Sequence, residues 1–176
     1  GKDFIKVGID PLVNKFKKYY QNIEFKISKF FNYQDINKLK LKKKFKIITA
    51  LSVFYDIKNP DVFLKNIKKI LHKKGIFSLE VADLYLILKR NMFDTICHEH
   101  LEYYSVRVIC EMARKSGLKV FDHKYNDING GSSRYYICHQ KTNYKIKQEK
   151  IDKLLLNERK ISLYSKKIFK NFFKKI

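Results

Sequence analysis

The chain has 176 residues, 45% of them hydrophobic, enough for one domain with a real core and too few for two ordinary domains. No apolar run approaches the about 20 residues of a membrane span, and no secretory leader opens the sequence. Three widely spaced cysteines without a CxxC pair argue against a disulfide frame and a structural zinc site. We therefore expect a cytoplasmic protein with reduced thiols, no membrane attachment and no metal.

The formal net charge is +22, which raises nucleic acid or an anionic membrane as a partner. However, the lysines run from Lys2 to Lys175 and do not gather on one predicted element. Abundant Lys, Ile and Asn with scarce Gly and Pro also indicate a genome rich in A and T. The even spread of the lysines and this compositional bias therefore disfavour nucleic acid as the physiological partner. A small anionic substrate would also benefit from the positive charge.

Apolar runs alternate with helical stripes along the first half of the chain. We expect strands at 4–10, 24–28, 45–50 and 76–81, and helices at 11–20, 34–41 and 61–71, with Gly75 ending the last helix. Strands and helices in this alternation predict βαβ units and a mostly parallel, doubly wound sheet.

The alternation pauses after Val81 for a histidine-rich segment. Beyond it we expect a helix at 106–115 closed by Gly117, a strand at 118–121, a tight turn at 129–132 and a strand at 134–139. From about residue 145 the pattern predicts one long, lysine-rich amphipathic helix. The division that we expect is therefore a domain over 1–142 and a helical region over 143–176.

Residues 93–105 concentrate ionisable side chains: Asp94, Cys97, His98, Glu99, His100, Glu102, Tyr103 and Tyr104. Imidazole titrates near pH ~6.5, so a histidine tuned by a neighbouring carboxylate can act as a general base at neutral pH. A polar loop beside a helix is the alternative. His98 and His100 would face one metal ion on a strand, but no third ligand is apparent. Cys97 is either a nucleophile or a bystander thiol, and no signature supports the first.

Two other segments carry functional potential. Asp10 ends the first predicted strand and could accept hydrogen bonds from ribose hydroxyls, or it could simply cap a helix. The run Asn129-Gly130-Gly131-Ser132-Ser133-Arg134 is a hairpin turn or a substrate loop. Glycines let the backbone approach a ligand closely, and an arginine can bind an anion in a bidentate manner.

Taken together, six segments resemble the SAM-dependent sugar C-methyltransferases in order and spacing, as far as about His139. They are Gly8–Pro11, Phe30–Asn32, Ile48–Tyr55, Gly75–Val81, Phe93–Leu101 and Gly130–Arg134. The Asp-Thr-Ile-x-His-Glu-His-Leu and Gly-Gly-Ser-x-Arg runs are the most specific of these. The resemblance implies a Rossmann-like class I methyltransferase sheet with helices on both faces, followed by the long C-terminal helix.

The family methylates a ring carbon of nucleotide-activated keto-deoxysugars, so the resemblance implies S-adenosyl-L-methionine (SAM) as cofactor and a nucleotide sugar as small-molecule substrate. By resemblance His100 is the base, with Glu99 orienting it or the sugar, and His98, Cys97 and Asp56 lie in the catalytic pocket. The sugar would contact Tyr103, Tyr104, Asn129, Gly130, Gly131, Ser132 and Arg134. SAM would contact Asp10, Phe31, Ala50, Leu51 and Ser52.

The sequence departs from the family in several places. Cys97 replaces the usual Tyr before His-Glu-His, and Asp56 replaces a usual His, both in the family's catalytic pocket. The family's zinc-binding region, first strand, glycine-rich loop and C-terminal α/β region are expected to be lacking. Three alternatives thus stay open: a class I O- or N-methyltransferase of another small molecule, an inactive fragment, and a basic nucleic-acid-binding protein. The oligomeric state is not predicted.

Overall fold

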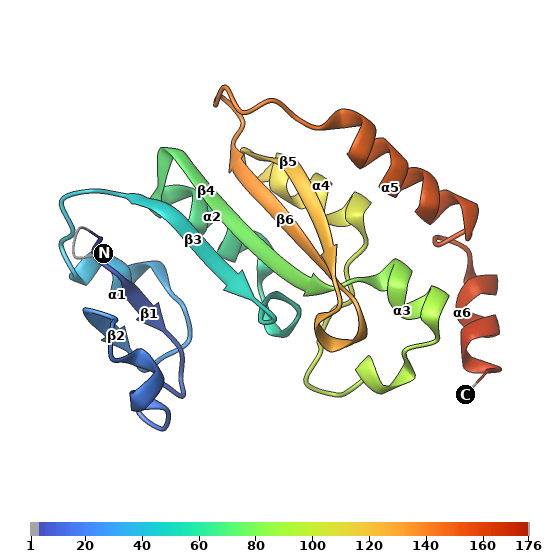
Figure 1. The fold of residues 1–176 in the computed structure, drawn as a ribbon, viewed down its shortest axis with the longest axis horizontal. Helices are drawn as coiled ribbons and strands as arrows, with labels where there is room; N and C mark the ends of the chain where they lie inside the picture. Colours follow the sequence, from blue (N-terminus) through green and yellow to red (C-terminus); the bar gives the residue numbers. More distant parts are fainter. Residues whose placement is uncertain (1–3, 176) are drawn as a thin grey trace. The chain divides into compact units, whose positions relative to one another are not determined.

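A computed structural model describes residues 4–175 of the chain. The chain forms two compact units, one up to Lys42 and one from Lys43 onward. Each unit contains its own β-sheet, of two strands in the first and four strands in the second. Figure 1 shows the elements of both units in chain order.

The first unit is built on two short parallel strands, β1 (Val7–Ile9) and β2 (Phe25–Ile27). Turns and a 3₁₀ helix (Lys17–Tyr20) occupy the segment in which we expected a helix over 11–20. The Asp10 carboxylate accepts a hydrogen bond from the Leu12 N–H at 2.6 Å, and such a local side-chain bond competes with regular helix formation. Helix α1 (Tyr33–Lys38) follows, and its N-cap Asn32 accepts from the Asp35 N–H.

The second unit has a four-stranded sheet in the order β3-β4-β6-β5. The strands are β3 (Phe45–Leu51), β4 (Leu71–Ala82), β5 (Leu118–Asn126) and β6 (Ser132–His139). β3 and β4 run parallel, whereas β4 pairs with β6, and β6 with β5, in antiparallel fashion. The expected hairpin around 129–132 is therefore present, but this sheet is mixed and not mostly parallel.

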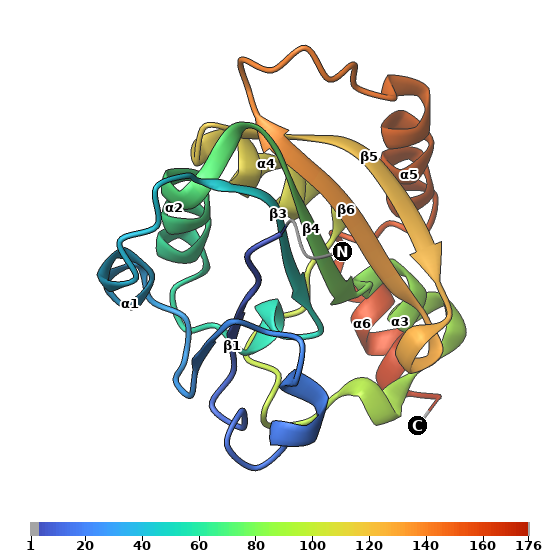
Figure 2. The same cartoon turned by 60° about the vertical axis from the view of Figure 1, so that its left-hand side comes forward.

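Helices α2 (Pro60–Ile70), α4 (Val106–Lys115) and α5 (Gln148–Lys160) cover one face of this sheet (Figures 1 and 2). The apolar stripe of α2 is buried against it, as the 3.6-residue period predicts. The central strands supply alternate, fully buried side chains to the same core: Phe77, Leu79, Val81, Tyr135 and Ile137. The sheet thereby fixes the carboxyl end of β4, where the candidate site begins.

Three local predictions are corrected. Helix α3 (Leu84–Arg90) forms where we expected only a histidine-rich loop, with Asp83 as its N-cap. Gly75 lies inside β4 and does not end α2; a Cβ there would come within 2.8 Å of the Phe45 carbonyl oxygen. The expected long C-terminal helix is two helices, α5 and α6 (Lys166–Phe173), separated at Ser162 by a left-handed residue with φ 53°.

Among residues 4–175, no helix has both the length and the apolar character needed to cross a membrane.

Candidate active site

The histidine-rich segment is an irregular loop between α3 and α4 that starts with a 3₁₀ turn, Phe93–Thr95. Backbone hydrogen bonds hold the second half of the loop in two places. The Tyr55 carbonyl, in the 3₁₀ turn that follows β3, accepts from the N–H groups of Leu101 and Glu102 at 3.0 and 3.2 Å. Near its end, the Tyr104 carbonyl accepts from the Leu84 N–H at 3.2 Å. The loop is therefore fixed against the carboxyl ends of β3 and β4.

His100 lies where these contacts converge. Its ring packs on Tyr55 at 4.1 Å between centroids and meets the edge of Tyr103 at 5.9 Å. Its Nδ1 atom is buried and has no hydrogen-bond partner among the described residues. Aromatic packing, rather than a hydrogen bond to Nδ1, thus sets the orientation of the imidazole.

Asp56 joins this cluster from a 3₁₀ turn after β3, Phe54–Asp56. Burial raises the pKa of its carboxyl, while the nearby His100 lowers that pKa and Glu99 raises it. Burial also raises the pKa of Tyr55, opposed by a hydrogen bond with Ser52. Ser52, Tyr55, Asp56 and His100 therefore form one connected group at the carboxyl end of β3, a position typical of sites in open α/β sheets.

The neighbours of His100 point elsewhere. The His98 and Glu99 side chains are 92% and 66% exposed and lie 3.4 Å apart, an ion pair when the imidazole is protonated. The Cys97 N–H donates to the Tyr103 hydroxyl at 3.3 Å, and that hydroxyl donates to the Thr95 carbonyl at 3.4 Å. Across residues 4–175 no group of three or more His, Cys, Asp or Glu side chains is arranged to hold a metal ion.

Tyr104, expected at the substrate, lies in the core. It is 4% exposed, packs on Phe54 at 4.9 Å, and its buried hydroxyl has no partner within the described part of the chain. Burial raises its pKa well above the ordinary value of tyrosine. Tyr104 is therefore placed to anchor the end of the loop to the core.

The Asn129–Arg134 run forms the β5–β6 connection, with a 3₁₀ turn at Ile128–Gly130. Asn129, Gly130 and Gly131 all have positive φ angles, of 53°, 78° and 150°. A Cβ on Gly131 would lie 2.8 Å from an Arg90 guanidinium nitrogen, and Arg90 itself donates to the Gly130 carbonyl. Glycine is thus required by both the backbone angle and the close approach of Arg90.

Two buried carboxylates of the β4 end hold the strand that follows this turn. Glu80, 1% exposed, accepts from the Arg134 Nε at 2.8 Å and pairs with its Nη2 at 2.6 Å, and it also accepts from the Asn126 amide at 2.7 Å. Asp83 accepts from the Ser133 hydroxyl at 2.5 Å. The Arg134 guanidinium therefore already has a buried partner, and one-third of its side chain is exposed.

The Asp83–Ser133 contact extends to His123, whose Nε2 lies 2.7 Å from the Ser133 oxygen. All three residues are buried. Burial raises the pKa of Asp83 to about 6 and lowers the pKa of His123 to about 4. Sequence reasoning missed Asp83, Glu80 and His123. An acid at the end of a buried strand could have indicated Asp83, as it did Asp10, but nothing in the sequence marks His123.

The residues expected at SAM are divided between the units. Asp10 and Phe31 belong to the first unit, and Ala50, Leu51 and Ser52 belong to the second. Asp10 directly follows β1, and Ala50 is buried near the end of β3. Ser52 has φ 53°, and its N–H donates to the Glu80 carbonyl at 3.1 Å. Both sets thus lie at the carboxyl ends of parallel strands.

The family model described as "Methyltransferase domain" matches residues 4–123. This chain belongs to that family. Solved structures of methyltransferases share its fold. One is a chain from the complex between the Haloferax volcanii Trm112 methyltransferase activator and a methyltransferase. It has a TM-score of 0.58 at 14% identity, and the match covers 79% of this chain and 73% of that chain. A SAM-dependent methyltransferase from Clostridium acetobutylicum has a TM-score of 0.56 at 11% identity, covering 77% and 75%.

Family and fold confirm the prediction of a Rossmann-like, SAM-dependent methyltransferase domain. A curated relative, C-methyltransferase NovU of Streptomyces niveus, is 40% identical over 75 residues. That match covers 42% of this chain and 18% of the relative. The part of NovU to which this chain is matched is therefore less than a fifth of NovU's length.

Proposed function

We propose that the protein containing this methyltransferase domain transfers a methyl group from SAM to a carbon beside the ketone of a nucleotide-activated keto-deoxysugar. The observation that carries the proposal is the convergence of His100, Asp56 and Tyr55 at the carboxyl end of β3. The partial identity to C-methyltransferase NovU favours carbon over oxygen or nitrogen as the acceptor.

The cluster suits abstraction of a carbon-bound proton. A neutral His100 imidazole takes the proton next to the ketone, the C–H electron pair passes into an enolate, and Asp56 favours the imidazolium that results. Tyr55 and Tyr103 hold the ring so that its approach to the substrate is fixed before the proton moves. In the methyl transfer that follows, the enolate electrons would form the new C–C bond and the ketone would re-form, while the methyl–sulfur electron pair would remain on the departing S-adenosylhomocysteine.

The residues present fit the methyl donor. The Asp10 carboxylate, with one oxygen bonded to the Leu12 N–H, retains acceptor capacity for ribose hydroxyls. Ala50 and Ser52, near the end of β3, carry small side chains that allow a ligand to approach the backbone closely. When bound, SAM would supply an electrophilic methyl group. Structures with a similar fold include PKMT2 from Rickettsia typhi in complex with AdoHcy, which covers 83% of this chain at a TM-score of 0.54 and 14% identity.

The test uses deuterium exchange. The protein is incubated in D₂O with S-adenosylhomocysteine and a nucleotide-linked 4-keto-deoxysugar, and NMR follows exchange of the protons beside the ketone. We expect exchange above the protein-free rate, and a loss of at least about 100-fold in the His100→Gln variant, the usual range for a general base. His98→Gln is the matched control, since the His98 side chain is 92% exposed and should leave exchange unchanged.

Equal exchange by the His100→Gln variant and the unmodified protein would remove His100 as the base. A second arm with ¹³C-methyl SAM separates the acceptor atoms, because methyl groups on carbon, oxygen and nitrogen have distinct chemical shifts. A label on oxygen or nitrogen would replace the C-methylation proposal with the alternative acceptor.

A further inference from the structure

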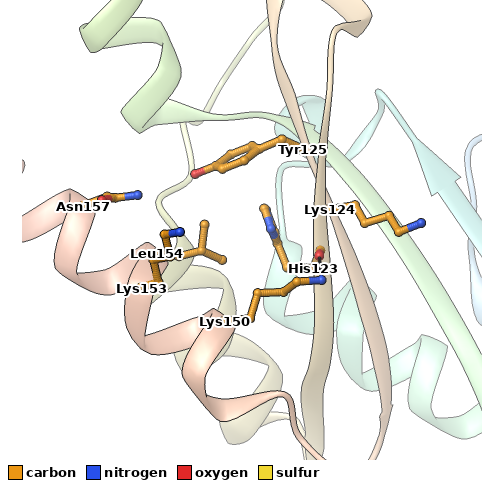
Figure 3. Close-up of a pocket in the computed structure, with 7 residues that line it drawn as sticks. All are labelled: His123, Lys124, Tyr125, Lys150, Lys153, Leu154 and Asn157. Atoms are coloured by element: carbon orange, nitrogen blue, oxygen red, sulfur yellow. Dashed lines mark hydrogen bonds between the residues drawn. The ribbon is translucent and has the colours of Figure 1, made fainter.

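A cavity of about 350 Å³ opens between β5 and α5, apart from the His100 cluster (Figure 3). Its walls are His123, Lys124, Tyr125, Lys150, Lys153, Leu154 and Asn157. This volume is at the lower end of the range for small-molecule sites. Nothing in the proposed methyl transfer uses these residues.

The charge of the cavity is positive. Three of the seven lining residues are lysines and none is acidic, while the buried Asp83 and Glu158 carboxylates lie behind the Tyr125 wall. The nearby Asp122 carboxylate is already paired with Lys147 at 2.6 Å and Lys150 at 2.8 Å, so it leaves an excess of positive charge beside the cavity. An anion entering this space would find its countercharge in place.

Three hydrogen-bond donors are available at one end. Figure 3 shows the Lys153 ammonium, the Asn157 amide and the Tyr125 hydroxyl directed toward the same part of the cavity. Within residues 4–175, these three polar groups make no hydrogen bond or ion pair. By contrast, Lys150 is bonded to Asp122 and to the His123 carbonyl, and Lys124 points away.

The remaining walls are flat or apolar. The Tyr125 and His123 rings meet edge to face at 4.6 Å, and Leu154 lies opposite them on α5. His123 is 2% exposed and tied to Ser133, so this wall is rigid. A ligand that fits would combine a charged group at the donor end with a ring or apolar body against Tyr125 and Leu154.

We propose that the β5–α5 cavity binds a small phosphate monoester carried on a ring, with Lys153, Asn157 and Tyr125 donating to the phosphoryl oxygens. A phosphate monoester presents three terminal oxygens to three separate donors, whereas a carboxylate presents two in one plane. The site is independent of the proposed methyl acceptor.

The experiment titrates phenyl phosphate into the ¹⁵N-labelled chain and follows the Asn157 side-chain amide and the Tyr125 backbone amide by NMR. Inorganic phosphate and phenol, titrated separately, test the charged group and the ring. We expect saturable shifts at Asn157 and Tyr125 with phenyl phosphate, and weaker binding of each half. Lys153→Gln should weaken phenyl phosphate binding by about tenfold, and Tyr125→Phe by a smaller factor.

Arg159→Gln is the matched control, because it removes the same single charge from the exposed side of α5 outside the cavity. Its affinity for phenyl phosphate should stay within about twofold of the unmodified chain. Equal losses in Lys153→Gln and Arg159→Gln would mean general attraction to a basic surface and would overturn the site. Absence of saturable shifts, or tighter binding of a DNA duplex that displaces phenyl phosphate, would overturn it as well.

Discussion

Asp83, Ser133 and His123 form a buried chain whose two ends respond to pH in opposite directions. Burial raises the Asp83 pKa from 3.8 to about 6, so between these values the folded state holds a proton that the unfolded chain has released. This contribution to the free energy of unfolding falls as pH rises. Burial lowers the His123 pKa from 6.5 to about 4, so its contribution rises with pH over nearly the same window.

The two contributions to the free energy of unfolding therefore offset one another between about pH 4 and 6. A substitution that removes one titrating group should reveal the pH dependence that the other group causes. Asp83→Asn keeps an acceptor for the Leu86 N–H, presents Ser133 with a donor in place of the carboxylate acceptor, and cannot titrate. Relative to the unmodified chain, we expect its unfolding free energy to gain up to about 3 kcal/mol from pH 4 to 6. His123→Gln should show the reverse trend. Urea denaturation at several pH values measures both, and parallel curves for all three proteins would contradict the opposed titrations.

At the scale of elements, the candidate substrate loop between β5 and β6 depends on its glycines for its conformation. Gly131 has φ 150°, and a Cβ there would meet both Arg90 and Leu86 within 3 Å. Gly117 also has a positive φ, of 74°, but its nearest neighbour is the ammonium end of the flexible Lys68 side chain. Substitution would therefore strain the backbone at both glycines, and only at Gly131 would the new Cβ also meet a buried side chain, that of Leu86.

We expect Gly131→Ala to lower the free energy of unfolding by about 2–3 kcal/mol, and Gly117→Ala by about 1 kcal/mol. Because Arg90 and Leu86 belong to α3, hydrogen exchange in α3 should accelerate in the first variant only. Equal stability losses, or unchanged exchange in α3, would show that the turn does not depend on the Arg90 contact.

The sequence predicted a helix well where capping residues and an apolar stripe occur together, and less well where one of these is missing. Helix α4 was predicted with correct bounds because Ser105 caps it, an apolar stripe runs along it and Gly117 follows it. Helix α3 was missed because Leu84–Leu88 is apolar on every face and gives no helical period. The break between α5 and α6 depends on Ser162 adopting a left-handed conformation, which serine rarely does and no sequence pattern announced.

For the whole molecule, the boundary between the two units falls in a lysine-rich segment. Lys42, Lys43 and Lys44 are exposed and lie outside helices and strands, whereas Lys73 and Lys74 are equally exposed but belong to β4. Protease access requires local unfolding of the backbone, which is easier in an unpaired segment than in a sheet strand.

Brief trypsin treatment should therefore cut first at Lys42–Lys44 and leave Lys73–Lys74 intact. Mass spectrometry of the early fragments should yield a product beginning at Lys43, Lys44 or Phe45. First cleavage at Lys73 or Lys74 would indicate that the start of β4 opens more readily than the segment joining the units.

The sequence predicted which residues belong to the candidate site, but it predicted only part of how their side chains are placed. The sequence pointed to His100 and Asp56, which the loop docking on Tyr55 brings together. It did not reveal that Arg134 pairs with buried Glu80 or that Tyr104 enters the core, because both depend on side-chain packing across strands far apart in sequence. Cross-strand partners follow from register, and the register between β4 and β6 was not predicted.

That register also constrains how the chain reaches its folded state. Ala82 pairs with Ser132, so the β4–β6 ladder closes a loop containing α3, the histidine-rich segment, α4 and β5. Closing a long loop costs entropy before its contacts are gained, which makes such pairing slow relative to local helix formation. The His100 loop and the Asp83–Ser133 bond should thus be among the last features to form during refolding, after α4 is already helical.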